Sequence, residues 1–336
     1  MPNDSRPRVA VLLSESTRAM VLTEESEHRL AGFAEVRAAG GPPSEWDLPS
    51  LLDGAVACLT GWGTPPLTAE VLATCPDLRL VAHSAGSIRN LVPQEAIGDR
   101  LTVCQAAGVI AESVAELVIL QILSALRELA ALDRGLRAGA TWGELRTRHP
   151  GRLLGARTVG VVGASRTGRA VIGLLQAFGG RVVVSDPILT ESQAEELGVE
   201  LVALDTLLSS CDVVTLHAPL LPETRDLLGA RELALLPDGA LLVNSARGGL
   251  IEPEALLAEL RSGRISAALD VFPSEPLPAD SVWRQLPNAI VSPHTAGHTI
   301  DSHARQGVAM VDEIERFLAK EPLRYAVPPD VAGILA

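Results

Sequence analysis

Short apolar runs rich in β-branched residues alternate with helical patterns along most of this 336-residue chain. Because a strand, a helix and a second strand in succession form a parallel βαβ unit, this alternation predicts a parallel α/β fold. The runs show no regular alternation of polar and apolar residues, which is expected when helices cover both faces of a sheet. At about 150 residues per domain, the length predicts two domains.

The apolar runs form two sets, separated by a long helical pattern. The first set lies at 7–13, 56–62, 78–84 and 101–106, and the second lies at 157–163, 181–186, 211–218, 240–246, 265–271 and 288–294. Between them, the capping-box pair Ser113 and Glu116 opens a largely apolar helical pattern of roughly seven turns. The polar stretch 141–156 then links this helix to the second set.

The end of the chain bears on the domain limits. A helical segment follows the last apolar run, and the Pro-rich tail after it is apolar enough to dock elsewhere on the molecule. We expect the tail to return to the first set of strands, which makes that domain discontinuous. The predicted domains are 1–107 plus 299–336, and 108–298.

Composition excludes several classes of protein. Lys and Arg number 28 against 41 Asp and Glu, a net charge of −13, so the basic face of a nucleic-acid binder is not expected. Lys320 is the only lysine and lies in an acidic helical stretch near the C-terminus. A P-loop needs a lysine inside its glycine loop, and a Schiff-base enzyme needs a buried one, so both classes are excluded.

Cysteines and apolar runs indicate the compartment. The four cysteines are scattered among apolar residues, without the paired spacing of a zinc site, so we expect buried thiols and no metal; they are Cys58, Cys75, Cys104 and Cys211. The N-terminal residues show no signal-peptide pattern. The longest strongly apolar run, LVILQILSAL, is too short to span a membrane. These features predict a soluble, cytoplasmic protein without a membrane partner.

A glycine loop opens the second set of strands. The run RTVGVVG leads into ASRTG and then into a helical pattern, so that Gly163, Ser165 and Gly168 occupy the three glycine positions of a dinucleotide-binding loop. Ser165 replaces the middle glycine; serine is small, and its hydroxyl can bond a phosphate. A structural turn without a ligand is the alternative interpretation.

Asp186 ends the next apolar run, about 20 residues after Gly163, where a carboxylate accepts hydrogen bonds from the adenosine ribose. The same carboxylate repels a 2′-phosphate, and no arginine follows it directly, so NAD is favoured over NADP. By itself, Asp186 can also be read as a turn or helix-capping residue.

Three ionisable side chains follow three later runs. Arg247, Glu275 and His294 each come just after an apolar run, and ligands of parallel sheets bind at the carboxyl ends of the strands. Together they form a plausible active-site set. Taken singly, each has a plainer interpretation as a surface charge, a turn residue or a loop histidine.

Several segments carry a family resemblance. SVAELVI, RTVGVVGASRTGR, CDVVTLHAPLLPETR, LLVNSARGGLIE, AALDVFPSEPL and SPHTAG, which span roughly 113–297, resemble the D-isomer-specific 2-hydroxyacid dehydrogenase family. This family includes D-phosphoglycerate dehydrogenases and glyoxylate/hydroxypyruvate reductases. The first domain resembles it more loosely, through VAHSAGSIRN, which lacks the usual Asp–Asn pair. The resemblance implies a flavodoxin-like substrate domain and a Rossmann NAD-binding domain, both doubly wound parallel sheets, with a cleft between them.

The resemblance also implies a catalytic set. Hydride passes between nicotinamide and C2 of a 2-keto or 2-hydroxy acid, while His294 exchanges a proton with the substrate oxygen. Glu275 would orient the imidazole ring. Arg247 would bind the substrate carboxylate or carbonyl oxygen.

Further residues are expected to bind the cofactor and the substrate. Arg166 and Thr167 would lie on the pyrophosphate, and Asp270 on the nicotinamide carboxamide. The other expected cofactor contacts are Pro219, Ser245, Ala246, His294 and Gly297. The expected substrate contacts, besides Arg247, are Ser84, Gly86, Ser87 and Arg89.

Some alternatives stay open at this stage. An NAD(H)-sensing protein like the C-terminal-binding corepressors keeps the same residues, whereas a methyltransferase would give Arg247, Glu275 and His294 no role. Within the enzyme interpretation, Arg89 could bind a second anionic group, such as a phosphate, phosphonate or carboxylate, and mark a specialised acid. The family resemblance also implies a homodimer formed through the cofactor domain.

Overall fold

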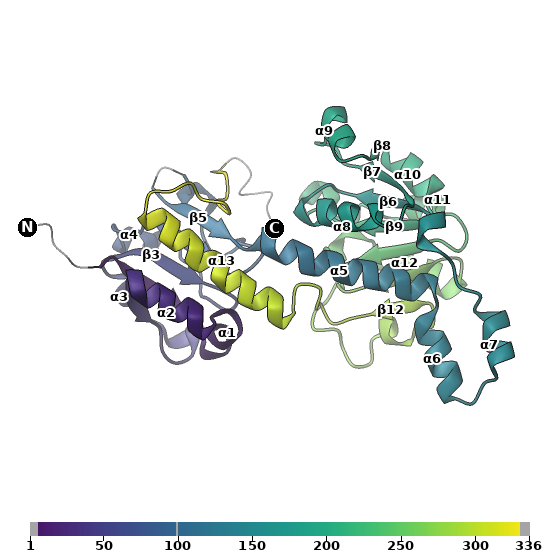
Figure 1. The fold of residues 1–336 in the computed structure, drawn as a ribbon, viewed down its shortest axis with the longest axis horizontal. Helices are drawn as coiled ribbons and strands as arrows, with labels where there is room; N and C mark the ends of the chain where they lie inside the picture. Colours follow the sequence, from purple (N-terminus) through teal and green to yellow (C-terminus); the bar gives the residue numbers. More distant parts are fainter. Residues whose placement is uncertain (1–5, 99, 330–336) are drawn as a thin grey trace, which may run out of the picture. The chain divides into compact units, whose positions relative to one another are not determined.

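The computed structural model describes residues 6–98 and 100–329. The chain forms two compact units (Figure 1): unit 1 contains the residues up to Ile110 and those from His298 onward, and unit 2 contains Ala111–Gly297. The limits predicted from sequence, 107/108 and 298/299, lie close to these. The part of the expected docking tail beyond Pro329 lies outside the described residues.

Unit 1 is built on a five-stranded parallel sheet. Its strands are β1 (Arg8–Leu12), β2 (Glu35–Ala38), β3 (Ala55–Thr60), β4 (Leu80–His83) and β5 (Thr102–Gln105). Its helices are α1 (Glu15–Val21), α2 (Glu24–Phe33), α3 (Leu48–Leu52), α4 (Ala69–Thr74) and α13 (Ile300–Leu318). The strand order β2-β1-β3-β4-β5 is the flavodoxin-like order, as predicted.

Two apolar cores cover the two faces of this sheet. In β1, Ala10 and Leu12 pack with α3 and α4, whereas Val9 and Val11 pack with α1, α2 and α13. Successive strand residues point to opposite faces, so a strand covered on both sides must be apolar at every position. This burial explains why the runs read as continuous apolar segments.

The C-terminal segment is fixed to β5 by a buried carboxylate. Glu313 of α13 is fully buried and accepts hydrogen bonds from the backbone N–H groups of Arg324 and Tyr325, at 3.0 Å each. The thiol of Cys104 donates a third bond to it, at 3.3 Å, and burial raises the pKa of that thiol, which keeps its proton in place. The backbone N–H of Val327 then donates a hydrogen bond to the carbonyl of Val103 in β5.

Unit 2 is built on a seven-stranded parallel sheet. Its strands are β6 (Thr158–Val162), β7 (Arg181–Ser185), β8 (Glu200–Leu201), β9 (Val213–Leu216), β10 (Leu241–Asn244), β11 (Ser266–Leu269) and β12 (Ala289–Val291). Its covering helices are α8 (Arg166–Gln176), α9 (Glu191–Glu196), α10 (Leu204–Ser210), α11 (Ala230–Leu235) and α12 (Pro253–Ser262). The order β12-β11-β10-β9-β6-β7-β8 reverses direction between β6 and β9, which is the switch point of a Rossmann sheet.

The helix between the two sets of strands differs from its prediction. α5 (Ala107–Leu126) begins six residues before Ser113, so Ser113 is not its N-cap. The Ser113 hydroxyl instead donates to the carbonyl of Ala296, at 2.8 Å. The helix also ends early: Glu128 takes a left-handed backbone conformation (φ 48°), after which α6 (Leu129–Arg137) and α7 (Trp142–Arg148) follow.

α5 corrects a further expectation. With 20 residues, it is long and apolar enough to cross a membrane by length and composition alone, whereas the sequence run suggested that it was too short. Its buried side chains Ala115, Val118 and Ile122 join the core formed with α8 and the sheet of unit 2. Within the apolar stretch of this helix, 33% is buried. A core helix meets the same criteria, so the finding is weak evidence for a membrane span.

Candidate active site

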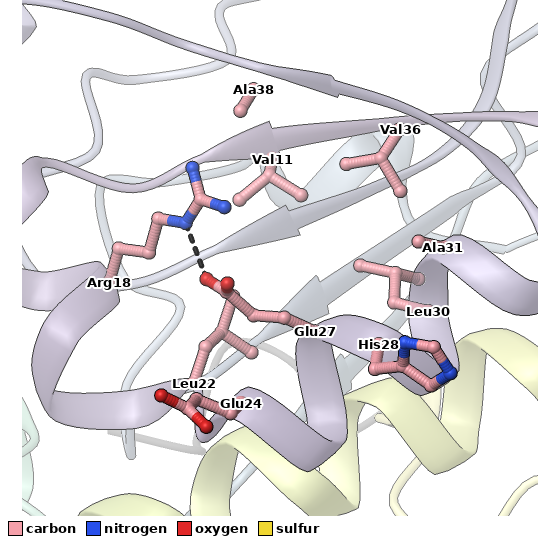
Figure 2. A pocket seen from close by; sticks show the side chains of 10 residues that line it. All are labelled: Val11, Arg18, Leu22, Glu24, Glu27, His28, Leu30, Ala31, Val36 and Ala38. Atoms are coloured by element: carbon pink, nitrogen blue, oxygen red, sulfur yellow. Dashed lines mark hydrogen bonds and ion pairs between the residues drawn. The ribbon is translucent and has the colours of Figure 1, made fainter.

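One cavity lies away from every predicted site residue. A cavity of about 470 Å³ opens in unit 1 between β1, β2, α1 and α2 (Figure 2). Val11 and Val36 form part of its wall, and Arg18 pairs across it with Glu27 at 2.6 Å. The chemistry that the sequence predicts lies elsewhere, at the carboxyl ends of the strands.

The glycine loop joins β6 to α8. Ser165 is the N-cap of α8, and its hydroxyl accepts the backbone N–H of Gly168 at 3.3 Å. A Cβ on Gly168 would lie 2.1 Å from the carbonyl oxygen of Gly163, so only glycine fits this close approach of helix and strand. Gly163 itself has φ +93° and fills the tight turn. The start of α8 is therefore a Gly-lined loop with N–H groups directed outward, where an anion is stabilised.

Asp186 follows β7 beside this loop. One of its carboxylate oxygens accepts the backbone N–H of Ala164 at 2.7 Å. The other oxygen accepts N–H groups of its own turn, from Ile188 at 2.8 Å and Leu189 at 3.1 Å. The carboxylate is thereby fixed next to the glycine loop, and both the ligand and the turn interpretations agree with this position.

His217, at the end of β9, supplies a second feature of the same region. Its backbone lies against Gly163, and its ring is buried, with Nε2 2.9 Å from the Thr215 hydroxyl. The other ring nitrogen, Nδ1, has no hydrogen-bond partner among the described residues. A buried polar atom without a partner is uncommon, and here it lies at the switch point of the sheet, where a ligand binds.

His294 and Glu275 form a close pair. Nδ1 of His294 lies 2.7 Å from Oε2 of Glu275, and Oε1 of the same carboxylate accepts the backbone N–H of Phe272 at 2.9 Å. Because a carboxylate only accepts, Nδ1 carries the hydrogen and Nε2 is left for another partner. The imidazole is 50% exposed, so Nε2 can reach a substrate.

The backbone of His294 is held in an unusual conformation. Its φ of 53° is left-handed, which costs roughly 1 kcal/mol or more in a residue other than glycine. The fully buried carboxylate of Asp270 fixes the residues that follow, since it accepts the N–H groups of Thr295 at 2.9 Å and Ala296 at 2.8 Å. The His294 N–H bonds the Asp270 carbonyl at 2.8 Å. Asp270 therefore determines where the imidazole stands.

Arg247 lies on a second loop, after β10. The buried amide of Asn244 clamps this loop: it accepts the N–H of Ala246 at 3.0 Å and donates to the carbonyl of Arg247 at 2.9 Å. The Arg247 guanidinium donates to the carbonyl of Ala246, at 2.7 Å. The Ser245 hydroxyl donates into α5, and Pro219 O accepts the hydroxyl of Thr224 at 2.6 Å. Hydrogen bonds from buried side chains thus support both the His294 loop and the Arg247 loop.

The predicted substrate turn lies in unit 1, after β4. Ser84 is fully buried and its hydroxyl donates to the Thr60 carbonyl at 2.9 Å, so it supports the turn from beneath. Ser87 Oγ accepts the N–H of Arg89 at 3.3 Å. His83 lies under the turn. Its Nδ1 is 3.0 Å from the Thr60 hydroxyl, and its side chain also bonds the backbone of Ser87.

The comparisons with known proteins agree with this geometry. Residues 119–296 match the model of the NAD-binding domain of the D-isomer-specific 2-hydroxyacid dehydrogenases, which is more than half of the chain. The chain belongs to this family. The matched segment contains the glycine loop, Asp186, Arg247, Glu275 and His294.

Similar proteins fall within the same family. The chain is 34% identical over 310 residues to D-3-phosphoglycerate dehydrogenase of Mycobacterium leprae, covering 92% of this chain but 58% of that protein. It is 34% identical to glyoxylate reductase of Korarchaeum cryptofilum, covering 80% of both chains. Among solved structures, a phosphoglycerate oxidoreductase from Rhizobium etli has a TM-score of 0.81 and 28% identity over 96% of this chain and 98% of that one.

NAD is the cofactor of this domain. The family model is that of an NAD-binding domain, and the residues of unit 2 fit such a ligand. The close approach of Gly168 to Gly163 and the carboxylate of Asp186 belong to the loops after β6 and β7, and His217, with its unpartnered Nδ1, follows β9 on the other side of the switch point.

Sequence reasoning did not single out four residues that support these loops. They are His83, Gln121, Asn244 and Ser292. A glutamine inside an apolar helix, and a histidine and an asparagine at the ends of apolar runs, are the signals that such residues leave, because buried polar side chains need partners. The residues predicted in unit 2 each belong to a recognisable motif.

Two buried histidines predict acid sensitivity. Burial lowers the pKa of His83 to about 4 and that of His217 to about 3. The unfolded chain takes up a proton at each ring below a pH of about 6.5, whereas the folded protein does not, so folding stability is complete above that pH and falls as the pH is lowered toward 4 and 3. Each ring contributes about 1.4 kcal/mol per pH unit in this window.

Urea unfolding between pH 8 and pH 4 measures this effect. In His83→Gln, the Thr60 bond can be retained while the titrating group is removed, so the loss of stability below pH 6.5 becomes less steep than in the original protein. Equal slopes for the two proteins would show that His83 does not titrate on unfolding.

Proposed function

We propose that this protein is an NAD-dependent oxidoreductase acting at C2 of a small 2-keto or 2-hydroxy acid, of the D-isomer type. The observation that carries the proposal is the pair formed by His294 and Glu275, at 2.7 Å, in the same unit as the NAD-binding loop. An oriented imidazole with a free Nε2 is a proton donor and acceptor, which a carbonyl reduction requires.

The proton steps follow from this arrangement. When bound, NADH would supply the hydride for C2 of the acid, and the residues of this chain would handle the proton. His294 gives the proton on Nε2 to the substrate oxygen, and in the oxidation direction it takes that proton back. Glu275 holds Nδ1–H throughout, so the ring keeps one orientation and its positive charge is compensated. Asp270 keeps the backbone of His294 in the conformation that presents Nε2.

Arg247 is proposed to bind the substrate carboxylate. A guanidinium pairs with a carboxylate through two parallel hydrogen bonds, which fixes the orientation of C2 as well as its position. Its loop is clamped by Asn244, as a geometric role requires. In unit 1, the turn at Gly86 and Ser87 is proposed to offer backbone N–H groups to the same acid, and Arg89 a second cationic contact.

The proposed cofactor contacts divide by chemistry. Arg166 and Thr167, in the first turn of α8, would bind the pyrophosphate, while Asp186 would accept the ribose hydroxyls and disfavour the 2′-phosphate of NADP. Pro219, Ser245 and Ala246 would line the nicotinamide ribose, with His294 and Gly297 close to the ring. Asp270 would lie beside the nicotinamide carboxamide.

The substrate proposal is limited to a class. The chain spans 58% of the Mycobacterium leprae phosphoglycerate dehydrogenase and 80% of the Korarchaeum glyoxylate reductase. We propose a small 2-keto acid, such as glyoxylate or hydroxypyruvate, with a phosphate- or phosphonate-bearing acid as the specialised alternative if Arg89 binds a second anion.

Oxidation of NADH, followed by absorbance across a panel of 2-keto acids, tests the proposal. We expect turnover with NADH, and at least about tenfold lower kcat/KM with NADPH, because Asp186 repels the extra phosphate. Arg89→Ala separates the substrate classes: it lowers kcat/KM only for acids with a second anionic group. Tight NADH binding without turnover of any acid would favour a cofactor-sensing role instead.

We propose that the chain forms a homodimer through an apolar surface on α5, on the helices α6 and α7, and on the segment after α7. This arm surface comprises Leu120, Leu129, Leu136, Trp142 and Leu153, all exposed, with Trp142 at 76%. Figure 1 shows α6 and α7 projecting from the end of α5 as a helical hairpin, and α6 has no buried residue. A hairpin with this much exposed apolar surface gains stability when a second copy covers it.

Sedimentation velocity tests the dimer. Replacing Leu129 and Leu136 together with Glu should weaken dimerisation by at least about 100-fold, since two apolar contacts of roughly 1.5–3 kcal/mol each are lost. The matched change at an exposed residue of unit 1, Ile300→Glu, should leave the dimer intact. A monomeric original protein at micromolar concentration would contradict the proposal.

We also propose a cytoplasmic location. All four cysteines are buried and none forms a disulfide, which suits a reducing compartment. The reaction proposed here uses soluble small acids and a soluble cofactor, and the apolar face of α5 has a packing role in unit 2.

A further inference from the structure

One polar side chain interrupts the apolar part of α5. Gln121 is 3% exposed, and its neighbours Val118, Ile119 and Ile122 pack in the core of unit 2. A buried amide costs free energy unless both of its ends are bonded. Both are: Oε1 accepts the hydroxyl of Ser245 at 3.1 Å, and Nε2 donates to the hydroxyl of Ser292 at 3.2 Å.

The hydrogen bonds continue to a carboxylate. The Ser292 hydroxyl donates to Oδ1 of Asp270 at 2.5 Å. Since a carboxylate only accepts, this bond fixes the direction of the whole chain, from Ser245 through Gln121 and Ser292 to Asp270. Bonds aligned in one direction in a buried site polarise and strengthen one another.

Two members of this hydrogen-bonded chain lie on the loops that carry Arg247 and His294. Ser245 is two residues before Arg247, and Ser292 is two residues before His294. Asp270, the last member, also holds the residues after His294 and so maintains its left-handed backbone. The side chain of Gln121 in α5 therefore forms a hydrogen bond with a residue of each loop.

We propose that Gln121 is a positioning residue that ties the Arg247 loop to the His294 loop and fixes the separation between the guanidinium and the imidazole. The inference rests on the proposed function, in which one group holds the substrate and the other exchanges its proton. Catalysis of this kind depends on placement, and shifts of about 1 Å between reacting groups lower rates markedly.

The fold alone gives no reason for an amide at this position. An unbranched apolar side chain of similar length, such as methionine, would fill the same space. The two hydrogen bonds of Gln121 largely offset the desolvation of its amide, so replacing it changes stability little. We therefore expect Gln121→Met to fold and to bind NADH, and its effect to appear in the loops.

Kinetics with the best acid of the panel give the first test. Gln121→Met should lower kcat and kcat/KM together by about tenfold, because the two loops lose the side chain that holds their spacing, with the Kd of NADH changed less than about twofold. Leu123→Met, on the same helix but outside the network, should behave like the original protein. In the double variant with Ser292→Ala, the losses should not multiply, because both changes break one chain.

Hydrogen exchange gives a second test that does not depend on turnover. Gln121→Met should speed amide exchange in the segments 245–250 and 292–297 and leave the rest of unit 2 unchanged, whereas Ser292→Ala should affect 292–297 alone. Unchanged exchange in both segments, or a uniform increase over unit 2, would overturn the inference. If no acid is turned over, the proposed function fails, while the exchange measurement still decides the role of Gln121.

Discussion

Replacing His294 with alanine should lower kcat for 2-keto acid reduction by about a thousandfold, within the range that general acid–base groups contribute. The structure leaves Nε2 of this imidazole facing outward, with Nδ1 held 2.7 Å from Glu275, so the ring has one nitrogen for the substrate oxygen. NADH should still bind, because the glycine loop and Asp186 are untouched. Stopped-flow absorbance of NADH measures the rate, and fluorescence titration measures the binding.

Glu275→Gln is the companion variant. Its amide can keep the contact with the Phe272 N–H through its oxygen, but its NH₂ group then faces Nδ1 and favours the tautomer with hydrogen on Nε2. The kcat for oxidation, in which Nε2 must accept a proton, should fall further than the kcat for reduction. Full activity in His294→Ala would remove the imidazole from the mechanism, and equal losses in both directions for Glu275→Gln would contradict the tautomer argument.

Replacing Gly168 with alanine should weaken NADH binding by about a hundredfold, the factor that corresponds to roughly 3 kcal/mol of overpacking. The added Cβ would lie 2.1 Å from the Gly163 carbonyl oxygen, a backbone atom that cannot move without opening the glycine loop. Calorimetric titration with NADH measures the change.

Gly173 offers a matched control in the same helix. A Cβ at Gly173 meets nothing within 4 Å, so Gly173→Ala should leave NADH binding unchanged. It should also stabilise the protein by roughly 0.5–1 kcal/mol, because alanine is the better helix former. Equal NADH affinities in the two variants would show that the close approach at Gly168 does not shape the site.

The fold could be predicted where strands are buried on both faces. All ten apolar runs became strands, because continuous apolar segments have few other places in a soluble domain. β2 and β8 were missed. β2 lies at the edge of its sheet with all four residues exposed, and β8 has two residues, so neither leaves an apolar run. Whether such a segment pairs as an edge strand depends on the neighbouring strand rather than on its own residues.

The helix after the first set of strands could be predicted only in part. Its apolar composition indicated a helix, but its start and end depend on contacts that sequence does not display. Ser113 and Glu116 match a capping box, yet the helix already begins at Ala107, and the Ser113 hydroxyl bonds the Ala296 carbonyl. The left-handed residue Glu128 ends a pattern that propensity alone would continue.

The candidate site divides in the same way. The glycine loop, Asp186 and the pairing of Glu275 with His294 follow motifs that one sequence can display. Gln121 and His83 do not, since their roles depend on partners more than twenty positions away. The sequence signal for Gln121 was the polar interruption of an apolar helix, which predicts a buried partner without naming it.

Transfer of deuterium from NADH labelled at C4 tests the central claim most directly. The product of a 2-keto acid should be the D-2-hydroxy acid with one deuterium at C2, detected by mass spectrometry and chiral chromatography, and His294→Ala should slow its formation. An unlabelled product, an L-isomer, or NADH oxidation without a hydroxy acid would contradict hydride transfer at C2 in this protein.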